Sequence, residues 1–339
     1  GLIRRLEETG HTYTSGGNVY FSIDTFPEYG KLARLDSQDL KSGARIEVDS
    51  NKKNPRDFVL WFTRGKFEHQ AMMWDSPWGR GYPGWHIECS AMSMKYLGEQ
   101  FDIHCGGVDH IPVHHTNEIA QSEAATGKRW VKYWVHGEFL VMDAGKMAKS
   151  KGNFVTLRTL KEQGYDPLDY RYFCLGGHYR SQLQFTPESL KAAASARRNL
   201  VERIQELQSR MEEASVPSEH EISDRAQEYL GDFRAAVTED LHVPKALSVV
   251  WNAVKDEDVA PSERLALLYD MDTILGLELA ETGSASAEID EESLALIRER
   301  EQARREKNFA RADEIRDELA ERGISIKDTP EGTVWTKSL

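Results

Sequence analysis

Apolar positions in the first half of the chain alternate between strand-like runs and helical spacing. The predicted elements are strands at 18–23 and 58–61, a helix at 87–97, a strand at 101–104, a helix at 114–126 and a strand at 133–136. Strands that alternate with helices of about ten residues form parallel sheets. The pattern of this half therefore predicts an α/β fold.

From Pro187 onward the pattern changes to alanine- and leucine-rich segments with a period of 3.6 residues, which predicts a helical bundle. The bundle segments are 187–213, 223–238 and 243–280, separated by Pro217 and Pro261. After a flexible linker at 282–287, a last unit is predicted to hold one charged helix and two short strands. Its elements are a helix at 291–322, stopped by Gly323, and strands around 324–326 and 333–335.

Composition is that of an ordinary globular protein, with 40% hydrophobic and 29% charged residues. The net charge of −13 argues against a chain that coats nucleic acid nonspecifically. No apolar run approaches a membrane span and the first residues do not form a signal peptide, so we expect a cytoplasmic protein. Three cysteines, Cys89, Cys105 and Cys174, are too few for a disulfide framework, which leaves metal binding, catalysis or packing.

A possible metal site comes from His114 and Glu118, which lie four residues apart in a predicted helix and so share one face. Cys89 could add a thiolate from a neighbouring element. All three side-chain types bind zinc, although no Cys-x-x-Cys pair supports zinc from spacing alone. The alternative is a buried helical cysteine beside an exposed polar face.

Two further segments suggest nucleotide chemistry. The turn at 146–151 concentrates lysines, which could neutralise a polyphosphate, or could be an ordinary solvated turn. Paired glycines and Asp109 follow the predicted strand at 101–104, at the strand end where nucleotides bind in open parallel sheets. A purely structural turn is the alternative there.

Four segments, taken in order, resemble the catalytic domain of cysteinyl-tRNA synthetases, which are class I aminoacyl-tRNA synthetases. They are Gly-Trp-His-Ile-Glu-Cys-Ser-Ala-Met at 84–92, Phe-Asp-Ile-His at 101–104, His-His-Thr-Asn-Glu-Ile-Ala-Gln at 114–121 and Lys-Met-Ala-Lys-Ser at 146–150. The resemblance continues through 177–181 and the helical region to 332–335, so it covers essentially the whole chain.

The resemblance implies an active-site zinc ion that binds the substrate thiolate, with Cys89, His114 and Glu118 as three of its four protein ligands. A fourth cysteine and the His-x-Gly-His signature of class I enzymes are expected upstream of Gly1. The chain is accordingly expected to be inactive or impaired without that segment. Cys105 is not expected to replace the fourth ligand.

The other site residues are also assigned by the resemblance. Trp85 and His104 are expected to line the amino-acid pocket near the zinc. Gly107 and Asp109 are expected to hold the adenosine of ATP, which is used with Mg²⁺. Lys149, assisted by Lys146, is expected to contact the phosphates in the transition state.

The implied fold is a partial class I Rossmann-like catalytic domain, followed by an α-helical bundle and a small α+β anticodon-binding unit. The boundaries are 1–150 for the catalytic part, 151–186 for a stem-contact connection, 187–281 for the tRNA-binding bundle and 288–339 for the anticodon unit. In that last unit, Trp335 could stack on a base.

Arginines of the predicted helix at 291–322 could contact the tRNA backbone, although a solvated helix with Glu–Arg pairs is a fair alternative. The candidates are Arg304 and Arg305, together with Arg298, Arg300 and Lys307.

The implied activity is ATP-dependent activation of cysteine and its transfer to tRNA(Cys), by a monomer. Two alternatives remain open. One is a ligase that joins cysteine to an amino sugar in mycothiol synthesis, against which the anticodon-like unit argues. The other is a truncated protein that binds tRNA or cysteine without catalysis.

Overall fold

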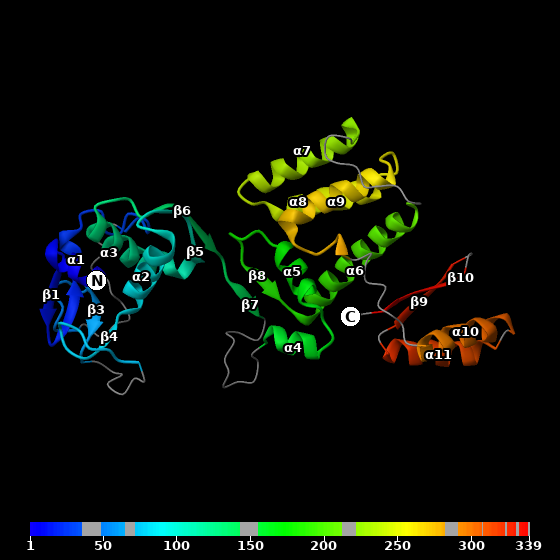
Figure 1. Cartoon of the computed structure of the whole chain (residues 1–339), viewed down its shortest axis with the longest axis horizontal. Helices are drawn as coiled ribbons and strands as arrows, with labels where there is room; N and C mark the ends of the chain where they lie inside the picture. Colours follow the sequence, from blue (N-terminus) through cyan, green and yellow to red (C-terminus); the bar gives the residue numbers. More distant parts are fainter. Residues whose placement is uncertain are drawn as a thin grey trace. The chain divides into compact units, whose positions relative to one another are not determined.

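The computed structural model describes residues 1–35, 49–64, 72–142, 155–211, 222–281, 291–306, 308–322, 324–329 and 332–337. The chain forms two compact units, shown in Figure 1. Unit 1 comprises Gly1–Phe139 with Tyr179–Gln182, and unit 2 comprises Leu140–His178 with Leu183–Leu339.

Unit 1 opens with a helix and a four-stranded antiparallel sheet. The elements are α1 (Leu2–Glu8), β1 (Thr12–Ser15), β2 (Asn18–Phe21), a 3-10 turn η1 (Ile23–Thr25), β3 (Phe58–Phe62) and β4 (Tyr82–Pro83), with strand order β1-β2-β3-β4. The two early strands are confirmed, but their antiparallel pairing differs from the predicted parallel sheet. Leu6, Phe21 and Leu60 are fully buried in the core of this part.

The rest of unit 1 follows the predicted alternation of helices and strands. It consists of α2 (Trp85–Leu97), β5 (Phe101–Gly107), a 3-10 turn η3 (Val108–His110), a π-helical turn η4 (Ile111–His115), α3 (Thr116–Thr126) and β6 (Val131–Gly137). β5 and β6 pair in parallel, as predicted. The strand predicted at 101–104 is confirmed, and Ile103 in it is 59% exposed. Within the described chain β5 pairs only with β6, so this parallel sheet has two strands.

Unit 2 begins with a small layered segment: β7 (Leu140–Met142), α4 (Leu157–Glu162), α5 (Pro167–Leu175) and β8 (Leu183–Phe185). β7 and β8 pair in parallel. Both helices start at capping boxes, where Thr156 and Asp166 accept hydrogen bonds from backbone N–H groups of the first turn. Phe173 and Phe185 pack edge to face at the centre of this segment.

The predicted helical bundle is confirmed. Its helices are α6 (Pro187–Ser209), α7 (Asp224–Thr238), α8 (Val243–Lys255) and α9 (Pro261–Leu275) (Figure 1). Pro261 opens α9, since proline is tolerated in the first turn of a helix, where its missing N–H would have no partner. No helix in the described ranges is both long and apolar enough to cross a membrane.

The last part of the chain contains α10 (Glu291–Arg305), α11 (Phe309–Glu321), β9 (Ile324–Thr329) and β10 (Gly332–Lys337). The two strands pair antiparallel, as expected for a hairpin. The single predicted helix at 291–322 is wrong, because the chain forms two helices. Asn308 begins the second helix by accepting a hydrogen bond from the Arg311 N–H. The prediction missed this N-cap because charged residues continue on both sides of it.

Leu268 on α9 tests how strongly the bundle depends on its core, because its side chain is completely buried. We expect Leu268→Ala to lower the free energy of unfolding by about 2–5 kcal/mol, since it removes apolar contacts and leaves a cavity. Ile274→Ala, on the same helix but 50% exposed, is the matched control and should cost about 0.5 kcal/mol or less. Urea unfolding measures both values, and equal losses would contradict the assignment of the core.

Candidate metal centre

The carboxylate of Glu118 on α3 is completely buried, and neither of its oxygens has a hydrogen-bond partner among the described residues. Removing a carboxylate from water is costly unless it is paired, hydrogen-bonded or bound to a metal. The side chains around Glu118 therefore determine which ion or ligand this part of unit 1 can bind.

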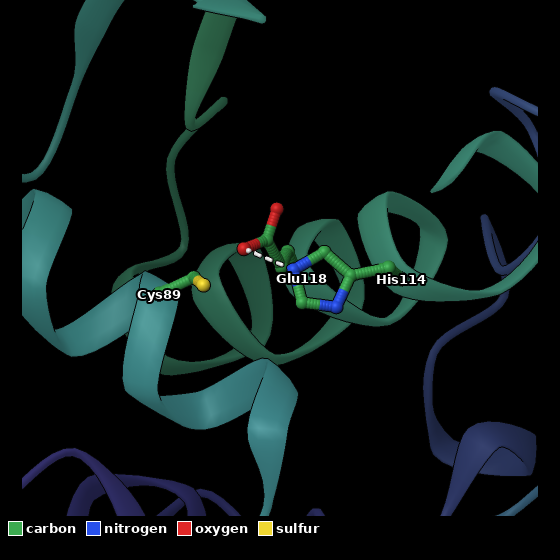
Figure 2. A group of neighbouring side chains, drawn as sticks. All are labelled: Cys89, His114 and Glu118. Atoms are coloured by element: carbon green, nitrogen blue, oxygen red, sulfur yellow. Dashed lines mark ion pairs between the residues drawn. The ribbon is translucent and has the colours of Figure 1, made fainter. Parts of the chain in front are cut away.

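Cys89, His114 and Glu118 come together as a potential metal-binding group. One ligand atom from each lies within 4.8 Å of the other two. The His114 Nε2 atom is 3.2 Å from Glu118 Oε1, and Figure 2 shows the Cys89 sulfur directed from α2 toward the same carboxylate. His114 and Glu118 share one helical face as predicted, but the alternative of an exposed polar face is wrong because both are buried.

The position of His114 depends on an unusual helical turn. Residues Ile111–His115 form a π-helical turn directly before α3. Such turns are rare and cluster at functional sites, because their extra residue per turn redirects side chains. The Thr116 hydroxyl donates to the Ile111 carbonyl at 2.7 Å and thereby supplies a partner at the start of the turn. His114 and His115 consequently both leave the turn beside Glu118.

A buried polar network holds α2 against α3 and so fixes Cys89 relative to Glu118. The Gln121 Nε2 atom donates to the Ser90 hydroxyl and to the His86 carbonyl, both at 2.6 Å. The Ser122 hydroxyl donates to Ser90 at 2.9 Å. Hydrogen bonds between fully buried groups specify one packing arrangement, because any displacement leaves a polar atom without a partner.

His86 supports His114 from the side away from Glu118. The Nδ1 atoms of the two rings are 2.8 Å apart, so the second nitrogen of His114 is bonded while its Nε2 faces the carboxylate. Metal-binding histidines commonly show this arrangement, in which the other ring nitrogen bonds a protein group. Burial, with a smaller contribution from His114, lowers the pKa of His86 to about 4, so its ring is neutral at pH 7.

The Cys89 thiol is not activated by the protein alone. Burial raises its pKa to about 11, and the neighbouring negative charge of Glu118 adds to the effect. Thiolate is the form that binds metal, so a cation bound here has to displace the thiol proton.

Further histidines surround the other oxygen of Glu118. His104 Nε2 lies 3.3 Å from Glu118 Oε2, and His115 Nε2 lies 4.0 Å from it. The His115 Nδ1 atom is 2.8 Å from His136 Nε2. Sequence reasoning assigned no role to His86, His115 or His136. Only their positions in the sequence could have indicated a role, since His115 follows His114 and His136 ends a predicted strand.

The predicted amino-acid pocket residues lie beside this group. Trp85, at the start of α2, is 58% exposed, and its ring centroid is 4.2 Å from that of His114. His104 is on β5 next to Glu118. Cys105, its neighbour in sequence, is exposed and belongs to neither group of potential metal ligands found in the described ranges.

The predicted adenosine residues lie at the carboxyl end of β5. The strand continues through Gly107, beyond the end predicted from the sequence, and Asp109 lies in the short turn η3 that follows. A Cβ atom at Gly107 would lie 2.4 Å from an Asp109 carboxylate oxygen, so a side chain there would displace this carboxylate. Lys146 and Lys149 fall in 143–154, outside the described residues.

The predicted basic face near the C-terminus is only partly present. Arg304 and Arg305 are exposed on α10, and Arg305 lies 3.6 Å from Glu301. Arg300 is buried and cannot contribute to such a face, a correction to the expectation. Lys307 and the side chain of Trp335 lie outside the part of the chain that the structure describes.

Comparison with known proteins covers both ends of the chain. Residues 1–195 match the family model of the class I (C) tRNA synthetase catalytic domain, and residues 286–335 match that of the cysteinyl-tRNA ligase anticodon binding domain. The chain is 52% identical to the cysteine--tRNA ligase of Treponema denticola, with 99% of this chain and 73% of that protein covered.

Two other relatives agree. The chain is 44% identical to the cysteine--tRNA ligase of Treponema pallidum, with 99% of this chain and 74% of that protein covered. It is 45% identical to that of Borrelia garinii, with 98% and 72% covered. The chain therefore belongs to the cysteine--tRNA ligase family of class I aminoacyl-tRNA synthetases.

Proposed function

We propose that the chain acts as a cysteine--tRNA ligase, which activates cysteine with ATP and transfers the cysteinyl group to tRNA(Cys). The observation that carries the proposal is the buried Glu118 carboxylate, with no hydrogen-bond partner, grouped with Cys89 and His114 in a member of this family. The cytoplasm, where ATP and tRNA meet, is the proposed compartment, and a monomer is the proposed state.

Cys89, His114 and Glu118 would hold a zinc ion. The donor set fits, because thiolate sulfur, imidazole nitrogen and carboxylate oxygen are the usual protein ligands of zinc, and neither Glu118 oxygen has a hydrogen-bond partner among the described residues. When bound, the ion would supply a soft Lewis acid that prefers a thiolate to a hydroxyl group. A purely hydrophobic pocket would separate cysteine from serine by only roughly a hundredfold.

Trp85 and His104 are proposed to form the walls of the cysteine pocket. The exposed Trp85 ring, packed against His114, offers an apolar surface beside the metal ligands. His104 lies on β5 and contacts Oε2 of Glu118, the carboxylate oxygen that does not face His114. Together they would fix the amino acid with its carboxylate free to react.

Gly107 and Asp109 are proposed to hold the adenosine of ATP. They follow β5, which pairs in parallel with β6, and nucleotides bind at the carboxyl ends of such strands. The cysteine carboxylate would attack the α-phosphorus and release pyrophosphate, with Lys146 and Lys149 stabilising the phosphate charge. Neither this step nor the transfer to the tRNA ribose requires a covalent enzyme intermediate, so positioning supplies the catalysis.

The C-terminal half is proposed to bind the tRNA. Residues 1–150 would carry the reaction, 151–186 would connect it to the tRNA stem, 187–281 would contact the stem, and 288–339 would read the anticodon. The match of 286–335 to an anticodon binding domain supports tRNA as the acceptor rather than an amino sugar. Arg304, Arg305 and Trp335 are the proposed contacts.

Cysteine-dependent exchange of pyrophosphate into ATP tests the activity. Because the chain spans 73% of the Treponema denticola relative, the assay is run on this chain and on a chimera that adds the remainder of that protein. We expect the chimera to exchange pyrophosphate in the presence of cysteine and not in the presence of serine. Exchange in neither protein, or equal rates with serine, would refute the proposal.

Glu118→Gln tests the metal centre, because it keeps the side-chain volume and removes the charge. Loss of an outer-shell partner typically costs about 10- to 100-fold in metal affinity, so loss of a direct ligand should cost roughly a hundredfold or more. Zinc competition titration measures the affinity. Glu88→Gln is the matched control, because Glu88 is exposed and directly precedes Cys89. A similar loss of zinc affinity in both variants would show that net charge, rather than direct binding by Glu118, determines the affinity.

His86→Gln tests the support given to His114. We expect zinc affinity to fall by about 10- to 100-fold, because the Nδ1 atom of His114 loses the partner that orients its ring. His11→Gln is the control, since His11 also lies in unit 1 but bonds Thr25. Unchanged affinity in His86→Gln would show that the His86–His114 contact does not orient the ligand.

A further inference from the structure

Unit 1 contains a cavity of about 700 Å³ whose lining includes none of the proposed zinc ligands or adenosine contacts. Its lining residues come from the segment 26–32, from α3 and from the segment 127–134. α3 contributes Thr116, Ile119 and Glu123, which lie three and four residues apart and so share one helical face. Glu118 leaves α3 on a different side, because successive residues of a helix turn by about 100°. The volume is within the range of small-molecule sites, about 300–1,000 Å³.

The walls of this cavity are mainly apolar. Phe26 and Leu32 contribute from the segment 26–32, Ile119 from α3, and Val131 and Trp134 from β6. Pockets of this composition bind flat apolar groups, and a small number of polar atoms fix their orientation. An aromatic ring is therefore the part of a ligand that these walls would contact.

The cations at the cavity already have partners, which argues against an anionic ligand. The Lys31 ammonium group lies 2.7 Å from Glu28, and the Lys128 ammonium group lies 2.8 Å from Glu99. The Arg129 guanidinium donates to two backbone carbonyl groups, at 3.1 and 2.8 Å. A bound phosphate or carboxylate would have to compete with these partners.

Glu123 offers the cavity a carboxylate oxygen that a ligand can use. Its Oε1 atom accepts a hydrogen bond from the Trp130 N–H at 3.0 Å, and no donor within the described ranges bonds Oε2. Burial raises the pKa of Glu123, because the charged form loses contact with water. An ammonium group beside Oε2 would restore that lost stabilisation through a charge-assisted hydrogen bond.

Two residues of the cavity wall also support the metal centre. The Thr116 hydroxyl donates to the Ile111 carbonyl in the π-helical turn that carries His114. The Trp134 ring centroid is 4.8 Å from that of His104, which we place in the cysteine pocket. A ligand that contacts Thr116 and Trp134 would therefore restrict the groups that orient a metal ligand and a pocket wall.

We propose that this cavity binds a small aromatic cation, with its ring against Trp134 and its ammonium group at Glu123 Oε2, and that occupation of the cavity raises the zinc affinity of the metal centre. The ligand site stands without the proposed function, because its lining residues are neither the zinc ligands nor the substrate contacts proposed above. Its effect on zinc rests on the proposed metal centre. By linkage, zinc has to raise the affinity for the cation by the same factor.

Binding of 2-phenylethylamine to the full chain tests the ligand site, with 2-phenylethanol as the uncharged probe of the same shape. Titration followed by ligand-observed NMR gives both dissociation constants. We expect the amine to bind about 10- to 100-fold more tightly than the alcohol, because only the amine forms a charge-assisted hydrogen bond with Glu123.

Variants of the lining residues place the amine in the cavity. Glu123→Gln should remove the preference for the amine, since glutamine keeps the volume and still accepts from the Trp130 N–H. Leu32→Trp fills the cavity and should abolish binding of both probes. Glu8→Gln, at an exposed position at the end of α1, is the matched control and should bind as the unchanged chain does. Circular dichroism checks that each variant folds, and if one cavity variant unfolds, the other decides.

The effect on the metal centre is measured by zinc competition titration with and without saturating 2-phenylethylamine. We expect zinc to bind about fivefold or more tightly in the presence of the amine, because the filled cavity restricts Thr116 and Trp134. At the same amine concentration, Glu123→Gln should show no such gain.

Each part of the proposal has its own contradicting result. Equal affinities for the amine and the alcohol, or amine binding that is unchanged in Glu123→Gln or Leu32→Trp, would overturn the ligand site. Selective amine binding with unchanged or weaker zinc affinity would overturn the link to the metal centre. A chain that binds the amine as expected but no zinc would refute the proposed metal centre and with it the link, and would still support the ligand site.

Discussion

A carboxylate that is taken out of water must be compensated, and in this chain that requirement falls on Glu118. Among the residues that the structure describes, neither oxygen has a hydrogen-bond donor, and the groups of potential ligands around it are a thiol and imidazoles. Burial lowers the pKa of His86 and of His104, which keeps their rings uncharged at pH 7. The proposed zinc ion would compensate the carboxylate and use all of these groups together.

The rest of unit 1 can be understood as the support for this arrangement. The Ser90–Gln121–Ser122 network fixes α2 against α3, and the π-helical turn presents two histidines to one carboxylate. Gly106 gives the His115 ring its space. Each feature costs conformational freedom or buries polar groups, which is typical of segments selected for function rather than for stability.

The sequence predicts the alternation of helices and strands and the bundle well, because hydrophobic spacing reports burial directly. The prediction from the sequence is wrong where long-range pairing or local polar contacts determine the structure. The antiparallel pairing of β2 with β3 joins segments that are distant in sequence, and the break before α11 depends on the Asn308 cap. His114 and Glu118 were predictable from helical spacing, whereas the contacts of His86 and His136 arise between distant segments and have no sequence period.

The most direct test of the account is the crystal structure of the zinc-loaded chain, with anomalous diffraction recorded at the zinc edge. The account predicts an anomalous peak bonded by Cys89 Sγ, His114 Nε2 and Glu118 Oε1. A zinc-loaded crystal with no peak within bonding distance of Glu118 would contradict the claim that a cation compensates this carboxylate.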